Sequence, residues 1–218
     1  MQTAKPLFAE LSEGNAGPQT RCTAFIGNRC IASGDLLHVA RQTKEAAERG
    51  ESGPITIFED ETSKVIEIDF HGTMQQVMQQ LTQADQPVGT VDGQEKRGPG
   101  RPKLGVVGRE VTLLPWHWNW LDGQPGGASV ALRKLVEEAR RTNQGKDQAR
   151  RSQDAVYWFM SVMAGTLPNY EEALRAFYRK NQERFAELIE PWPSDIRDHL
   201  KKLVAVAARD QAAAQEKR

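Results

Sequence analysis

The chain has 218 residues, of which 39% are hydrophobic and 27% charged, and its 29 basic residues balance 29 acidic ones. This length and composition are typical of a globular protein with a substantial core, which excludes a disulfide-stapled miniprotein. No segment approaches the roughly 20 consecutive apolar residues of a membrane helix, and the N-terminus lacks the pattern of a signal peptide, so we expect a cytoplasmic protein with no membrane partner.

The balanced charge hides an uneven distribution along the chain. Seven basic and 13 acidic residues precede residue 95, 12 basic and 6 acidic residues lie between 95 and 151, and ten of each follow. A positive segment flanked by acidic and neutral ones favours contact with a polyanion. A solvated basic linker is the alternative interpretation.

A hairpin and a helix are predicted first, after a flexible N-terminus over residues 1–20. Two β-prone runs, 23–26 and 30–32, flank Gly27-Asn28-Arg29, which is a turn signal. Apolar residues then recur at helical spacing from Asp35, and Gly50 can end that helix.

The same pattern repeats, which predicts an α+β domain over residues 21–83. A second hairpin is expected from 55–58 and 65–70, followed by a second helix capped by Thr73. Two ββα units in tandem place helices on one face of an antiparallel sheet. The expected fold class is therefore α+β: a ββαββα domain, a short strand-helix-helix module and an all-helical C-terminal unit.

A basic linker rich in Gly and Pro is predicted over residues 84–103. It contains the sequence RGPGRPK, an extended cationic ribbon that suits the minor groove of A·T-rich DNA, and it is similar to the Gly-Arg-Pro core of AT-hook peptides. Here Pro99 divides the glycine-arginine run that the AT-hook family keeps continuous. The residues expected to contact DNA in this linker are Lys96, Arg97, Arg101, Pro102 and Lys103.

The next segment, 104–141, resembles the ribbon-helix-helix family in the order of its elements. A short strand at 109–114 is stopped by Pro115, an aromatic helix follows, and a second helix begins at Ser129. In that family two chains pair their strands into a ribbon that enters the major groove, and the start of the second helix holds a phosphate. The resemblance implies a homodimer in which Arg109, Thr112 and Ser129 contact DNA.

The strand and the first helix also suggest a dimer interface. On a helix, Trp118 falls on the side of Leu121 and is expected in the core, whereas Trp116 and Trp120 share another face. We expect Trp116, Trp120, Val111 and Leu113 at the interface. Neither face of the strand carries the polar and basic residues that read bases, and the first helix is about one turn short for the family. Dimerisation is therefore an alternative role for the module.

An all-helical unit is predicted over residues 152–208, after a polar stretch at 142–151. One of its helices is expected to start at Asn169, with Glu172 as the reciprocal capping partner. Residues 209–218 are polar and rich in alanine, and a flexible tail is predicted there.

Signals for catalysis, metals and cofactors are weak. The four histidines have no metal-ligand spacing, CxxC and HExxH are missing, and no phosphate loop or nucleophile elbow is found, so we expect no metal, no cofactor and no enzyme. Asp69, His71 and Thr73 could form an acid/base cluster, but a helix cap beside a surface histidine explains them more simply. Cys22 and Cys30 are expected as unbridged thiols.

Taken whole, the chain resembles a bacterial family known as domain of unknown function 2239. The resemblance rests on Thr23-Ala24-Phe25, on residues 31–35 and 97–107, on Arg109 to Pro115 and on residues 126–133, and it extends from about 22 to 205. It implies that the two halves belong together and supplies no activity.

These observations lead to two main hypotheses, beside a third, an enzyme, which would need a pocket around His71. The first is a cytoplasmic, homodimeric, DNA-associated protein with a role in transcription regulation, which uses the basic linker and the ribbon-helix-helix-like module. The second is a protein-interaction or scaffold dimer in which the tryptophans and the strand make the contact and the linker is solvated.

Overall fold

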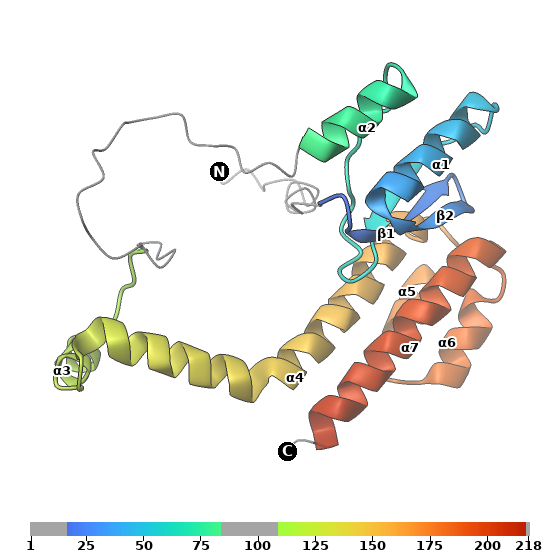
Figure 1. Ribbon diagram of the computed structural model, residues 1–218. Coiled ribbons are helices and arrows are strands. Elements are labelled where there is room, and N and C mark those ends of the chain that lie inside the picture. Colours follow the sequence, from blue (N-terminus) through green and yellow to red (C-terminus); the bar gives the residue numbers. More distant parts are fainter. Residues whose placement is uncertain (1–16, 84–108, 217–218) are drawn as a thin grey trace, which may run out of the picture. The chain divides into compact units, whose positions relative to one another are not determined.

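The structure is a computed structural model that describes residues 17–83 and 109–216 (Figure 1). The described residues fall into two compact units, which we treat separately: unit 1 contains 17–83 and 145–216, and unit 2 contains 109–144. The elements are β1 (Arg21–Ile26), β2 (Arg29–Asp35), α1 (Leu36–Glu48), β3 (Ile55–Glu59), α2 (Met74–Gln83), α3 (Pro115–Asp122), α4 (Gly127–Met163), α5 (Tyr170–Tyr178), α6 (Gln182–Ile189) and α7 (Ser194–Glu216). The expected α+β class is confirmed.

The sheet of unit 1 has three antiparallel strands in the order β2-β1-β3. The first predicted hairpin is confirmed: β1 and β2 pair from Arg21 opposite Asp35, around a turn in which Gly27 has a φ of +55°. Glycine adopts this left-handed conformation without steric cost, which is why Gly27 in the sequence predicts the turn correctly. β1 is the central strand, and its residues from Cys22 to Ile26 are all buried.

The second predicted hairpin is wrong in its second strand. β3 forms, but residues 65–70 make only a single bridge, between Phe58 and Val65, before the chain leaves the sheet. Ile66, Ile68 and Phe70 pack against the core beside α1 instead. The carbonyl of Phe70 accepts a hydrogen bond from Lys44 Nζ at 3.0 Å, so a side chain satisfies backbone that a strand partner was expected to satisfy.

The two N-terminal helices begin where their capping residues predict. Asp35 accepts a hydrogen bond from the backbone N–H of His38 at 2.9 Å, and α1 follows at once. Thr73 caps α2: its hydroxyl accepts from the Gln76 N–H at 3.3 Å, and the Gln76 side chain accepts from the Thr73 N–H at 2.8 Å. This reciprocal pair is a capping box.

Each face of the sheet has its own core. On one face Cys22, Ala24 and Ile57 pack with Leu36 and Val39 of α1. On the other face Phe25 and Phe58 pack on Phe159 of α4, with ring centroids 5.7 and 5.1 Å apart respectively. The sheet thus lies between α1 and the C-terminal helices (Figure 1). Segments 21–83 and 152–208, which the sequence analysis treats as separate domains, share this second core.

A single helix, α4, replaces two predicted ones, and α7 extends through the predicted tail. No break occurs at 142–151, and residues 209–216 are helical. The two corrections have one cause, because these segments pack on each other. Gly145 lies against Ala214, where an added Cβ would be 3.5 Å from the Ala214 Cα. Gln148 donates to Asp210 at 3.3 Å, and Gln153 donates to Gln211 at 2.7 Å.

α5 begins after Asn169 as predicted, but without the predicted capping pair. Asn169 has a φ of +62°, and its side chain makes no capping hydrogen bond. In this left-handed conformation the side chain does not reach the free N–H groups of the first turn, so Glu172 has no reciprocal role. Glu172 instead forms an ion pair with Arg175, at 3.6 Å.

Candidate interaction surface of unit 2

Unit 2 is an extended segment followed by a helix, a glycine turn and the start of α4. α3 begins at Pro115, whose ring fixes a helical φ, and the Leu114 N–H donates to His117 Nδ1 at 3.3 Å. Gly126 and Gly127 have φ of +87° and +75°, which makes the turn into α4. Leu121 is buried, as predicted. The strand predicted at 109–114 does not form within the described chain, where these residues have no strand partner.

Large apolar side chains are exposed mainly in this unit. Among the described residues, seven of the nine exposed large hydrophobic side chains belong to unit 2. They are Val111, Leu114, Trp116, Trp118, Trp120, Leu135 and Val136, which we call the apolar surface. Single exposed apolar residues are ordinary on proteins, whereas several exposed in one small unit make that unit a candidate interaction surface.

Three of the four residues predicted for the interface, Val111, Trp116 and Trp120, belong to the apolar surface, and Leu113 does not. Trp116 is 64% exposed and Trp120 is 54% exposed, and they lie four residues apart on α3. Val111 is also exposed and Leu113 is half-buried. Trp118, which the helical spacing assigns to the core, is instead 36% exposed. Leu121 is the only buried residue of the eight-residue helix α3.

The residues predicted to contact DNA divide into two groups. Lys96, Arg97, Arg101, Pro102 and Lys103 lie outside the described residues. Arg109 and Thr112 are exposed in the extended segment. Ser129 is exposed as the third residue of α4 and not its N-cap, because the turn at Gly126 and Gly127 starts the helix two residues earlier than predicted.

Basic side chains exceed acidic ones along unit 2 and the following turns of α4. Residues 109–151 contain eight basic and five acidic residues. Three of the arginines are paired with carboxylates three residues earlier: Arg140 with Glu137, Arg141 with Glu138 and Arg150 with Asp147. Arg109, Arg133 and Lys134 are exposed and form no ion pair with any described residue.

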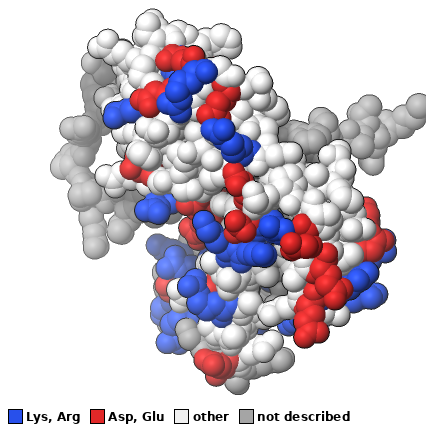
Figure 2. Space-filling view, turned by 90° about the vertical axis from the view of Figure 1, so that its right-hand side faces the viewer, with Lys and Arg blue, Asp and Glu red and all other residues white. Residues whose placement is uncertain are grey.

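The face of the molecule in Figure 2 shows no such excess of basic side chains. Basic and acidic side chains are interspersed over most of it, without a continuous field of one sign. Such a surface suits solvent and does not attract a polyanion strongly. The basic excess in the sequence is concentrated between residues 95 and 151.

The candidate acid/base cluster forms a turn. The pKa of the Asp69 carboxyl is lowered because it accepts hydrogen bonds from the His71 backbone N–H, at 2.9 Å, and from the His71 ring. The His71 side chain is 97% exposed, and the Thr73 hydroxyl is used in the α2 cap. The three groups therefore do not converge on one point.

The two cysteines differ in exposure: Cys22 is buried and Cys30 is half-buried. Cys22 and Cys30 are both unbridged, and burial raises the pKa of the Cys22 thiol to about 12 and raises that of Cys30 as well. A thiol with a raised pKa is a poor nucleophile at neutral pH. Within the described ranges no cluster of three or more His, Cys, Asp or Glu residues is arranged to hold a metal ion.

Sequence reasoning did not single out His199. Its ring lies against Phe25 and Phe159, with centroids 5.6 and 4.6 Å away, and its Nε2 has no hydrogen-bond partner among the described residues. Burial lowers its pKa. The only sequence signal was its place one residue before Leu200, on the edge of the apolar stripe of α7.

These features define an α+β protein with an exposed apolar surface in a separate helical unit. The chain belongs to the family described as "Uncharacterized protein conserved in bacteria (DUF2239)", which matches residues 21–204. No curated protein and no solved structure matches the chain. No helix in the described segments combines the length and apolar character needed to cross a bilayer.

Proposed function

We propose that the protein is a homodimer, formed through unit 2, that binds duplex DNA and regulates transcription. The observation that carries the proposal is the apolar surface, whose tryptophans have no covering partner among the described residues. Burying a large apolar side chain is worth about 1.5–3 kcal/mol. Association with a second copy that covers several of them is therefore favoured by the hydrophobic effect.

The unpaired segment 109–114 supports a second copy in particular. An isolated strand is unstable in water, whereas two such segments pair as an antiparallel ribbon across a two-fold axis. Leu114, with φ −67° and ψ 150°, has the extended, polyproline II-like backbone expected of the residue before Pro115.

Dimerisation also brings two basic segments together. Each chain supplies Lys96, Arg97, Arg101, Lys103 and Arg109, so a dimer carries ten such cations. If all ten neutralise phosphates, the slope of log affinity against log salt is about −9, because each contact on duplex DNA contributes about −0.9. The two thiols without a disulfide support a reducing compartment, and we propose the cytoplasm.

The test is a salt titration of binding to an A·T-rich duplex and a G·C-rich duplex, followed by fluorescence anisotropy. The double variant Arg101→Ala/Lys103→Ala removes four of the ten cations per dimer, so we expect the slope to become shallower by up to about 3.6. The matched control is Arg41→Ala/Lys202→Ala, which removes the same charge from exposed positions in unit 1. Absence of binding at low salt would contradict the DNA role.

A protein-interaction dimer without DNA binding is the second candidate function. It is favoured by the 109–114 segment, in which Glu110 is exposed together with Val111 and Leu114. A carboxylate and apolar groups on the ribbon suit a protein partner better than phosphates. A dimer in light scattering combined with a flat DNA titration identifies this case.

A further inference from the structure

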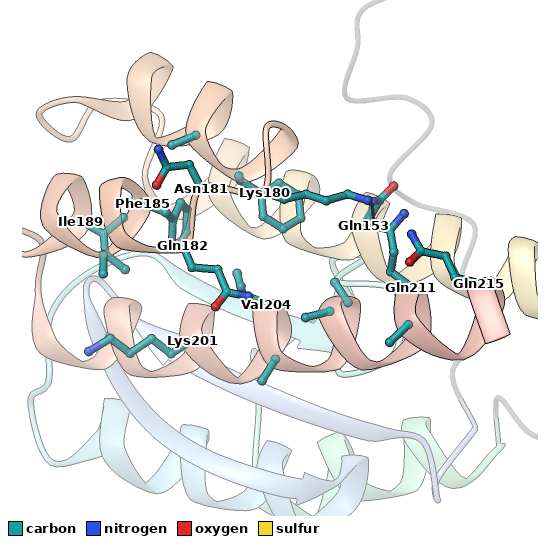
Figure 3. A pocket seen from close by; sticks show the side chains of 17 residues that line it. Gln153, Lys180, Asn181, Gln182, Phe185, Ile189, Lys201, Val204, Gln211 and Gln215 are labelled. Carbon is teal, nitrogen blue, oxygen red and sulfur yellow. Dashed lines mark hydrogen bonds between the residues drawn. The ribbon is translucent and has the colours of Figure 1, made fainter.

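Unit 1 contains a groove of about 630 Å³ that the proposed function does not use (Figure 3). α6 and α7 form its walls, with the end of α5 and Gln153 of α4. The apolar residues that line the groove include Phe177, Phe185, Ile189 and Val204, together with alanines of α7. This volume lies in the range of roughly 300–1,000 Å³ that is usual for small-molecule sites.

The groove is long. Its lining residues on α7 run from Lys201 to Gln215, which corresponds to about 21 Å at 1.5 Å per residue. Ala205, Ala208 and Ala212 recur along this face of α7, and their small side chains keep the groove open over its length. An extended alkyl chain matches this shape better than a compact ring system does.

The charged groups of the groove have one sign. Lys180 and Lys201 line it, the other polar lining residues are neutral amides, and none of the described lining residues is acidic. In Figure 3 the Lys180 side chain extends along the groove, and the Gln182 side chain turns toward Val204. An anionic head group therefore finds a cation and amide donors, and a cationic one finds no counter-charge.

Lys180 also ends α5, in a left-handed backbone conformation. Lys180 follows the end of α5 with a φ of +58°, its N–H donates to Phe177 O at 2.9 Å, and the Asn181 N–H donates to Ala176 O at 3.0 Å. This is a Schellman motif, in which glycine is strongly preferred at the left-handed position. A lysine at this position is less favourable than glycine, so its backbone conformation can be relieved by a substitution that also removes the side chain.

We propose that this groove binds a long-chain amphiphile with one anionic head group, a fatty acid or a close relative. The alkyl chain lies against the apolar lining of the groove along α7, and the carboxylate pairs with Lys180. The proposal is independent of dimerisation and of DNA binding, because every residue it uses belongs to unit 1.

The experiment is calorimetric titration of the full chain with three probes of equal chain length, below their micelle concentrations. The probes are hexadecanoate, its methyl ester and hexadecyltrimethylammonium. We expect hexadecanoate to bind at least tenfold more tightly than the other two. Equal affinity for all three probes would overturn the proposal, as would an absence of hexadecanoate binding.

Lys180→Gly is the decisive variant, because it should change stability and binding in opposite directions. Glycine relieves the left-handed strain, so we expect a higher Tm together with at least tenfold weaker hexadecanoate binding. Asn169→Gly is the matched control: it relieves a φ of +62° at the other end of α5, outside the groove, and should raise Tm with affinity unchanged. Unchanged affinity in Lys180→Gly would overturn the assignment of the head group.

Discussion

Substitution of Trp120 by alanine tests the proposed dimer interface most directly. A tryptophan side chain presents up to about 250 Å², and Trp120 is 54% exposed, which leaves about 135 Å² per chain for a partner to cover. If the dimer covers half of that area in each of two chains, the loss is about 3.4 kcal/mol at about 25 cal/mol per Å². The dissociation constant should then rise by about two orders of magnitude.

Sedimentation equilibrium over a wide concentration range measures this shift. Tyr178→Ala is the matched control, because Tyr178 is an aromatic residue of similar exposure, 50%, that lies in unit 1. The control should dimerise as the wild type does. A wild-type chain that stays monomeric at every concentration would refute the reasoning, and so would a Trp120→Ala variant that dimerises normally.

Two further predictions concern unit 1. Gly145→Ala should raise the free energy of unfolding by about 0.5–1 kcal/mol in urea denaturation, because glycine is unfavourable inside a helix. The new Cβ would make only an ordinary contact with Ala214. A lower stability of this variant would contradict the packing of α4 on α7. The pKa of His199 is lowered by burial, with the Asp60 charge opposing the shift, so the unfolded chain binds the proton more readily. Stability should therefore fall as pH decreases below about 6.5. His199→Leu should flatten that dependence, and an unchanged profile in this variant would assign it to other groups.

Short-range signals were sufficient where the structure is local. The turn at Gly27-Asn28, the cap at Asp35 and the capping box of Thr73 and Gln76 each depend on residues within a few positions of one another. The sequence could not predict that residues 65–70 leave the sheet, because that depends on the Lys44 hydrogen bond to Phe70 from another element. Continuity of α4 likewise depends on α7, through Gly145 and Ala214.

The same distinction applies to the functional surfaces. Helical spacing was enough to assign Trp116 and Trp120 to one exposed face, since both lie on a short helix with one buried residue. The groove was not predictable, because three helices and Gln153 must pack before it exists. The left-handed conformation of Lys180 also has no sequence signal, since lysine is not the residue that this position prefers.

Dimerisation and DNA binding are linked in a way that a single variant can test. A monomer carries five of the ten proposed phosphate-binding cations, so the salt slope of a monomeric Trp120→Ala chain should be about −4.5 where the dimer gives about −9. Trp120 itself carries no charge, so the halving must come from the loss of the second copy. Anisotropy titrations at a concentration where sedimentation finds the variant monomeric provide the measurement. A full slope in the monomer would mean that the second copy contributes nothing to DNA binding, and the two halves of the proposed function would then have to be argued separately.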